Sequence, residues 1–150
     1  MKESMLIELG YGIFIVGICV FVQGATLLTL FFWLQRFFAS IQDKFNIVRN
    51  FFVVISVVWI LSIMHLIQAA IWAIAYYLLG GLGSYYQALY FSIITMSTVG
   101  YGDLTAPSDW RLFGGIEALM GPLLFGWSAS FLFGTVNRFY QIRSTGSKKR

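Results

Sequence analysis

Three apolar segments constrain this chain more than any other feature. They run roughly from Met5 to Leu34, from Phe51 to Leu79 and from Leu112 to Val136. A helix needs about 20 apolar residues to cross the hydrocarbon core of a bilayer, and each segment is long enough. With 59% of residues hydrophobic and 11% charged, little polar sequence remains for a soluble domain. The sequence therefore predicts an all-α integral membrane protein with three transmembrane helices.

The distribution of basic residues predicts an orientation. The linker between the first two segments carries Arg36, Lys44 and Arg49, and Arg138, Arg143, Lys148, Lys149 and Arg150 follow the third segment. Cytoplasmic loops are enriched in Lys and Arg, so we expect both regions inside and the N-terminus outside, in a plasma or bacterial inner membrane. The net charge of +4 then indicates topology and no nucleic-acid binding. The basic residues 148–150 are a candidate contact for anionic lipid.

A cleaved signal peptide is the alternative interpretation of the first segment, because Lys2 precedes an apolar stretch. However, Glu3 and Glu8 lie in the flank that should be basic, and the apolar run is longer than a usual signal sequence. Cleavage would also leave the basic linker outside. A retained helix is favoured, and the lone Cys19 within it reads as a small buried hydrophobic residue.

The linker from Gln35 to Asn50 has a helical pattern of its own. Its apolar residues recur at helical spacing opposite polar ones. They are Phe37, Phe38, Ile41, Phe45 and Val48. We expect a short helix in the cytoplasmic interface with Ser40 as a candidate cap, and a solvated loop is the alternative. Residues 1–50 would then form an extra helix and linker, with the helix peripheral to the pore and bracing the second segment.

The second segment contains His65, three residues from both Ser62 and Gln68. Polar residues inside a membrane are costly and often mark function. His65 is a candidate pH sensor, because histidine titrates near neutral pH. The alternative is a neutral histidine hydrogen-bonded to a neighbouring helix.

A half-length helix is predicted between the second and third segments. Gly80-Gly81-Leu82-Gly83 breaks the preceding helix, and Ser84 precedes Gln87 by three residues, a capping-box pattern. A helix over 85–97 would be about 18–20 Å long, which is too short for the ~30 Å hydrocarbon core. It must enter and return, and irregular backbone at that depth is tolerated only where it is buried in protein or lines water.

The pentapeptide Thr98-Val99-Gly100-Tyr101-Gly102 follows this helix, and Asp103 comes next. The stretch from Ala88 to Gly134 resembles the pore domain of tetrameric potassium channels, in which four TVGYG loops coordinate K⁺ through backbone carbonyls. The resemblance implies an outer helix at 51–79, a pore helix at 85–97, a selectivity filter at 98–102, an inner helix at 112–136 and a short basic cytoplasmic tail at 138–150.

The resemblance implies a role for each motif residue. The carbonyls of Thr98, Val99, Gly100 and Tyr101, with the Thr98 hydroxyl, would coordinate K⁺. Gly100 and Gly102 would permit the necessary backbone turns. The Tyr101 side chain would pack behind the filter. Asp103 would lie at the outer mouth, where it can attract cations; a plain solvated loop acid is the alternative.

Two departures from the family pattern bear on the rigidity of the filter. Many members pair tryptophans in the pore helix, where this chain has Tyr90-Phe91, and some carry a glutamate behind the filter, where this chain has Ile94. Glu117, the only acid well inside the third segment, is a candidate to support the filter from behind and, with His65, a candidate pH sensor. Its alternative is to snorkel to the outer interface.

The third segment is expected to line the pore. Gly121-Pro122 removes a backbone hydrogen bond and invites a kink, and Gly121 is the candidate for the hinge glycine that the family often has. Phe133 is a candidate constriction, and ordinary packing or lipid contact explains it equally well. No segment has arginines at three-residue intervals, so a voltage sensor is not predicted.

We expect passive, K⁺-selective conduction by a homotetramer, because one filter strand cannot enclose an ion. A weakly selective cation channel and a non-conducting regulatory or structural subunit are the alternatives. An enzyme is not expected, since titratable residues are few and scattered, and no cofactor is predicted. The expected partners are membrane lipid, K⁺ and other copies of the chain.

Overall fold

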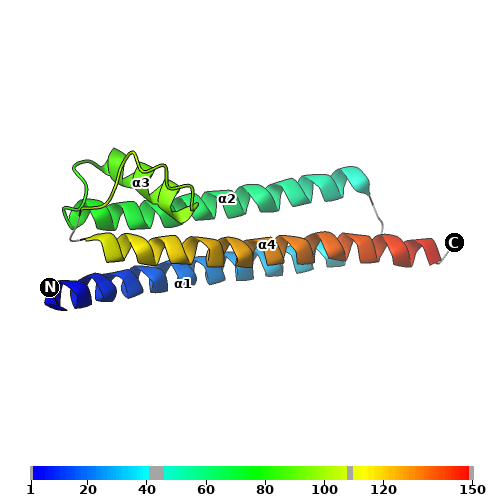
Figure 1. Cartoon of the computed structure of the whole chain (residues 1–150). Helices are drawn as coiled ribbons and strands as arrows, with labels where there is room; N and C mark the ends of the chain where they lie inside the picture. Colours follow the sequence, from blue (N-terminus) through cyan, green and yellow to red (C-terminus); the bar gives the residue numbers. More distant parts are fainter. Residues whose placement is uncertain (1, 41–45, 108–109, 149–150) are drawn as a thin grey trace.

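The structure is a computed structural model that describes residues 2–40, 46–107 and 110–148. The helices of the described residues are α1 (Lys2–Ser40), α2 (Ile47–Leu78), α3 (Tyr85–Met96) and α4 (Arg111–Lys148). Three of them are long and lie side by side, and the short α3 folds back against one end of α2 (Figure 1). The predicted all-helical fold, with three long apolar helices and one short helix, is confirmed.

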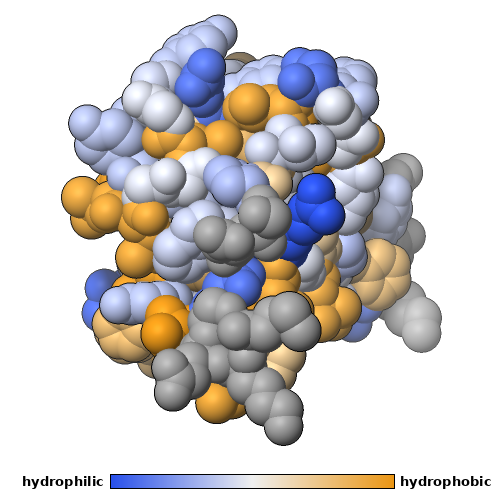
Figure 2. Space-filling model, turned by 60° about the vertical axis from the view of Figure 1, so that its left-hand side comes forward, coloured by the Kyte–Doolittle hydropathy of each residue, from blue (hydrophilic) through white to orange (hydrophobic). Residues whose placement is uncertain are grey.

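Within the part of the chain that the structure describes, three helical stretches are long and apolar enough to cross a membrane: Met5–Ser40, Ile47–Leu78 and Arg111–Gln141. Large apolar side chains on their outer faces, such as Phe14, Trp59 and Leu66, are exposed. A helix that is apolar all round suits a hydrocarbon environment. The chain is a multi-pass membrane protein with three candidate spans. Figure 2 brings one end of the bundle forward and shows hydrophilic residues interspersed with apolar ones there.

The bundle has two distinct ends. The α3 end holds α3 and residues 98–102, and the far end is where α1 leads towards α2 (Figure 1). Helices α1 and α4 run in the same direction, because Glu8 meets the start of α4 at the α3 end and the rings of Phe38 and Phe139 lie 5.1 Å apart at the far end. Helix α2 runs the opposite way between these ends.

The buried core falls into two apolar clusters along the bundle. The cluster near the α3 end is built around the aromatic residues Trp72, Tyr76, Phe91 and Phe113. The far-end cluster is mostly aliphatic and includes Leu27, Leu34, Val57, Met64 and Phe139. Aromatic edge-to-face packing, such as Tyr76 on Phe91 at 5.1 Å, adds directional contacts to apolar burial. The first cluster therefore anchors α3 to both long helices beside it.

The linker and the end of the chain differ from expectation. Residues 35–40, predicted to begin an interfacial helix, continue α1, and residues 47–50 begin α2, with Asn46 as its N-cap. The reason is packing, since Phe38 lies on Phe139 and prolongs the α1–α4 contact. Ser40 ends α1 instead of capping a new helix, and its hydroxyl donates to the Phe37 carbonyl. Residues 41–45 lie outside the described residues. Helix α4 extends to Lys148, beyond the expected end at 136.

Candidate functional site

The start of α3 is determined by a tight turn and a cap. Gly80 has φ 71, a conformation that glycine adopts without steric cost, and it follows the end of α2. The hydroxyl of Ser84 then accepts the backbone N–H of Gln87 at 3.2 Å. Satisfying an orphan amide in this way stabilises a helix start. The N-cap predicted at Ser84 is confirmed.

Residues 98–102 have a backbone of alternating hand. Positive φ occurs at Thr98 (62), Gly100 (51) and Gly102 (78), and not at Val99 or Tyr101 between them. In a backbone of alternating φ sign, the polar groups of successive peptides point to the same side. When those groups are N–H, the row binds anions. A row of carbonyls would present the opposite charge. Thr98 is the exceptional residue, because β-branched side chains rarely tolerate positive φ.

This segment is tied back to the end of α3 by its own amides. The N–H of Thr98 donates to the Thr95 carbonyl and the N–H of Gly100 donates to the Ile94 carbonyl, both at 3.0 Å. These bonds use the amide groups to orient the segment, and its carbonyl groups take no part in them. The end of α3 also carries the partial negative charge of the helix dipole. The site therefore combines a backbone held by hydrogen bonds to α3 with a local field that suits a cation.

One side of the segment is open. The side chains of Val99 and Tyr101 are 51% and 73% exposed. Just before the segment, α4 packs against the end of α3, where an ideal Cβ built on Gly121 would lie 1.9 Å from the Met96 carbonyl oxygen. Only glycine permits so close an approach. Gly121 is thus a contact point between α4 and the last turn of α3, and its role as a hinge stays a prediction.

Asp103 is an exposed loop residue that is hydrogen-bonded to α3. The Tyr90 hydroxyl donates to Asp103 Oδ2 at 2.7 Å, and this carboxylate raises the pKa of the Tyr90 phenol. The sequence marked Tyr90 only as a departure from the family's tryptophan pair. The structure brings it together with Asp103, so a phenol on α3 holds the loop that follows residues 98–102.

Glu117 is fully buried where α2, α3 and α4 meet. It accepts hydrogen bonds from the hydroxyls of Tyr76, at 2.8 Å, and of Ser92. The expected alternative, snorkelling to the interface, is wrong because both carboxyl oxygens already have partners inside the protein. Tyr76 and Ser92 were missed in the sequence. The available signal was a hydroxyl on each neighbouring helix that could face Glu117, the acid inside the third segment.

His65 belongs to a polar group at the middle of the bundle. Its Nδ1 lies 2.8 Å from Gln68 Oε1 and its Nε2 lies 3.0 Å from Ser128 Oγ. The edge of its ring packs on Phe125, with centroids 4.6 Å apart. Ser62, the third polar residue of the predicted series, is separate, since its hydroxyl donates to the Val58 carbonyl of its own helix.

Gln23 of α1 completes this polar group. Gln23 Nε2 donates to Ser128 Oγ at 2.9 Å and to the Leu124 carbonyl at 3.2 Å, and Gln23 Oε1 accepts from Gln68 Nε2 at 3.0 Å. Gln23 and Gln68 are both fully buried. Side-chain hydrogen bonds across helices stabilise membrane bundles. All three spans therefore meet at one polar layer.

Glu8 caps the start of α4 from α1. Its Oε2 accepts the backbone N–H groups of Leu112 and Phe113 at 3.1 and 3.3 Å. A carboxylate at a helix N-terminus satisfies orphan amides and interacts favourably with the helix dipole. In the sequence, Glu8 counted only as an acidic flank. Glu8 is only 8% exposed, and its carboxylate links α1 to the start of α4.

The remaining gate candidates lie on α4. The helix continues through Pro122, which lacks the N–H that would bond the Ala118 carbonyl. Phe133 is 72% exposed in the single chain. Its role as a constriction stays a prediction.

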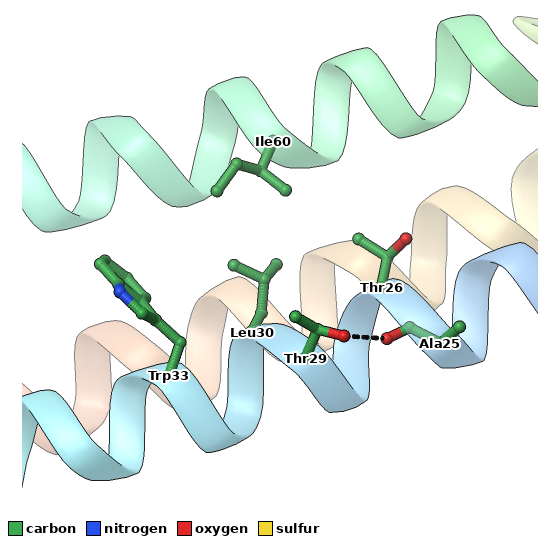
Figure 3. Close-up of a pocket in the computed structure, with 6 residues that line it drawn as sticks. All are labelled: Ala25, Thr26, Thr29, Leu30, Trp33 and Ile60. Carbon is green, nitrogen blue, oxygen red and sulfur yellow. Dashed lines mark hydrogen bonds between the residues drawn. The ribbon is translucent and has the colours of Figure 1, made fainter.

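A shallow apolar groove of about 430 Å³ lies between α1 and α2. Figure 3 shows its lining residues, which are Ala25, Thr26, Thr29, Leu30, Trp33 and Ile60. The Thr29 hydroxyl donates to the Ala25 carbonyl at 2.8 Å, so its polarity is satisfied within α1. The residues of the polar group around His65 do not line this groove.

Residues 51–138 match a protein family described as ion channel. The match contains most of α2, all of α3, residues 98–102 and most of α4, and it covers more than half of the chain. The chain belongs to this ion channel family. The protein is therefore an ion channel and not an enzyme. No curated protein and no solved structure matches the chain. Helix α1 precedes the matched region, so its contacts with α4 are additional to the family's pore region in this channel.

Proposed function

We propose that this ion channel is selective for potassium and that four copies bring residues 98–102 together around one axis. The observation that carries the proposal is the alternating backbone of a Thr-Val-Gly-Tyr-Gly segment at the end of a half-length helix. Carbonyl oxygens of Thr98, Val99, Gly100 and Tyr101, with the Thr98 hydroxyl, would replace the hydration shell of K⁺ at successive sites, and several sites in a row permit conduction.

The open side of the segment supports the proposed assembly. One chain offers a single row of carbonyls, and an ion must be surrounded. The exposed Val99 and Tyr101 would be covered by neighbouring copies, with Tyr101 packed behind the filter. Closed rotational symmetry is the usual arrangement of identical subunits.

We further propose that the α3 end faces outwards and the far end faces the cytoplasm of a plasma or bacterial inner membrane. Arg36 and Arg49 lie towards the far end, and Arg138 lies on the part of α4 that reaches it. Basic residues favour the cytoplasmic side. Asp103 would then lie at the outer mouth.

The buried contacts suggest how the filter is supported. Glu117 bonds Ser92 of α3 from behind, and Gly121 contacts the end of α3. We propose that both hold α3 at the correct distance from the axis. Pro122 is the proposed bending point of α4, and Phe133 the proposed constriction.

Purified protein reconstituted in liposomes tests the proposal. With K⁺ on one side and Na⁺ on the other, the reversal potential should follow the K⁺ gradient, and Ba²⁺ should block the flux. Gly100→Ala should abolish selective flux because alanine disfavours φ 51, whereas Gly17→Ala, which has open space around it, is the control. A reversal potential that follows Na⁺ and K⁺ equally would favour the weakly selective alternative. Absence of any Ba²⁺-sensitive K⁺ flux would favour the non-conducting one.

A further inference from the structure

The polar layer at the middle of the bundle is a closed hydrogen-bond ring of Gln23, Gln68, His65 and Ser128. We propose that this ring is a releasable latch by which α1 and α2 hold the part of α4 beyond Pro122, so that Gln23 and Ser128 are positioning residues for channel opening. The inference rests on the proposed pore role of α4. It assigns a function to α1, which precedes the region matched to the family.

Each member of the ring can donate to the next when His65 is neutral. Neutral imidazole has one donor and one acceptor nitrogen. Because Gln68 Oε1 can only accept, the nitrogen facing it, Nδ1, carries the proton. Nε2 then accepts from the Ser128 hydroxyl. Gln68 donates to Gln23, and Gln23 donates to Ser128. The circle closes with every link satisfied.

The side-chain amides of the two glutamines also donate to backbone carbonyls, one on α1 and one on α4. The second hydrogen of Gln68 Nε2 reaches the Cys19 carbonyl at 3.1 Å, and that of Gln23 Nε2 reaches the Leu124 carbonyl. A fully satisfied polar network rigidifies a buried site, whereas a partly satisfied one is costly. The ring therefore favours one relative position of α1, α2 and α4.

The ring lies on one side of a weak point in α4. Pro122 interrupts the backbone hydrogen bonds of this helix. Before it, Glu117 is bonded to α2 and α3. After it, Leu124 and Ser128 are bonded to Gln23. A bend at Pro122 would leave the Glu117 contacts in place and would have to break the contacts of Ser128.

The two apolar clusters also meet at this layer. Cys19 and Leu124 belong to the cluster near the α3 end, and Leu27 and Met64 belong to the far-end cluster. Apolar packing provides little orientation by itself within a membrane, because lipid tails are equally apolar. The directional bonds of the ring are what specify the register of α4 at this level.

Ser128→Ala tests the latch, with Ser130→Ala as a matched control. The Ser130 hydroxyl bonds only the Gly126 carbonyl of its own helix, so both variants lose one hydroxyl from α4. Full-length protein in liposomes would be studied by single-channel recording. It would also carry a spin-label pair at Phe52→Cys and Tyr140→Cys, two exposed positions towards the far end, in a Cys19→Ala background. Excess unlabelled chain would ensure that distances report on pairs within one chain.

We expect Ser128→Ala to change the open-to-closed ratio by roughly three- to tenfold, the range that intramembrane hydrogen bonds support, and to shift or broaden the distance distribution. Ser130→Ala should match the wild type in both. Gln23→Met, which keeps a similar volume, should change the ratio in the same direction. The double variant should change it by less than the product of the two single effects, since both remove one shared link.

Identical behaviour of Ser128→Ala and Ser130→Ala would overturn the latch. So would a lowered melting temperature of Ser128→Ala with unchanged ratio and distances, because that result indicates packing alone. Independent, multiplicative effects of Gln23→Met and Ser128→Ala would also overturn it. The distances need no ion selectivity. If K⁺ conduction fails, the potassium proposal fails while the spin-label result still decides the latch.

Discussion

At the scale of single residues, Gly121 and Glu117 occupy positions where the backbone contact or the burial leaves no substitute. Gly121 allows α4 to contact the Met96 carbonyl, and Glu117 occupies a site with a hydroxyl donor on each of two helices. Both residues stand out in the sequence, one in a Gly-Pro pair and one as an intramembrane acid. Their partners do not stand out.

Gly121→Ala should abolish K⁺-selective flux. The added Cβ would lie 1.9 Å from a carbonyl oxygen, so α4 or the last turn of α3 must move, and that turn leads directly into residues 98–102. Gly17→Ala should behave as wild type, because nothing lies within 4 Å of the added atom. Liposome flux with a K⁺ gradient measures both. Normal selective flux in Gly121→Ala would show that this contact has no influence on the filter.

Glu117→Leu should lower thermal stability more than Tyr76→Phe. The leucine leaves the buried Tyr76 hydroxyl without its acceptor, a cost of about 1–3 kcal/mol, whereas Tyr76→Phe removes one hydrogen bond worth about 1 kcal/mol. Thermal unfolding of the purified protein in detergent gives the order. If Tyr76→Phe were the more destabilising change, the carboxyl group would not be the centre of this cluster.

The pH response of the channel separates the two proposed sensors. Protonation of His65 adds an N–H at Nε2, where the ring needs an acceptor for Ser128. We therefore expect K⁺ flux to change between about pH 5 and 8, the range of histidine titration, and His65→Ala to remove that change. Glu117→Gln tests the second group. Should neither substitution alter the pH profile, both sensor proposals fail.

At the scale of helices, α1 is an integral part of the bundle. Its expected position peripheral to the pore stays a prediction, and it contacts α2, the segment it was expected to brace. It also follows α4 along its length, with contacts at Glu8, at Gly12 against Ile116, at Gln23 and at Phe38. Parallel packing at several levels means that α1 and α4 cannot slide independently.

Glu8→Ala should loosen the start of α4. Two backbone amides lose their acceptor, and the favourable interaction with the helix dipole, about 0.3–1 kcal/mol, is also lost. Glu8→Gln keeps one side-chain acceptor and should be intermediate. Amide hydrogen exchange at Leu112 and Phe113 is the measurement, and faster exchange in the alanine variant is the expected result. Unchanged exchange in Glu8→Ala would show that the cap makes no contribution.

At the scale of the whole molecule, residues 98–102 are exposed in one chain. One face of α4 also carries exposed apolar residues, such as Leu119, Leu123 and Phe133. The exposed apolar residues on this face are of the same kinds as those on α1, so their chemistry alone does not separate a lipid contact from a subunit contact. Assembly is what would give this face a separate role.

Tyr101→Ala should weaken assembly and selectivity together. The Tyr101 ring is 73% exposed in a single chain, and large aromatic side chains contribute strongly when an interface buries them. Native mass spectrometry in detergent should show fewer tetramers. Tyr86, an exposed tyrosine on α3, provides the comparison as Tyr86→Ala. Full tetramer formation by Tyr101→Ala would place this side chain outside the subunit interface.

The sequence by itself determined the number of spans, the half-length α3 and its cap at Ser84, because hydropathy, length and capping act locally along the chain. The tertiary structure alone decided which polar residues meet. Gln23 and Ser128 are 105 residues apart, as are Glu8 and Phe113, and no local pattern links them. Their pairing depends on α1 running parallel to α4, a matter of helix packing that hydrophobicity leaves open since every face of these helices is apolar enough for lipid.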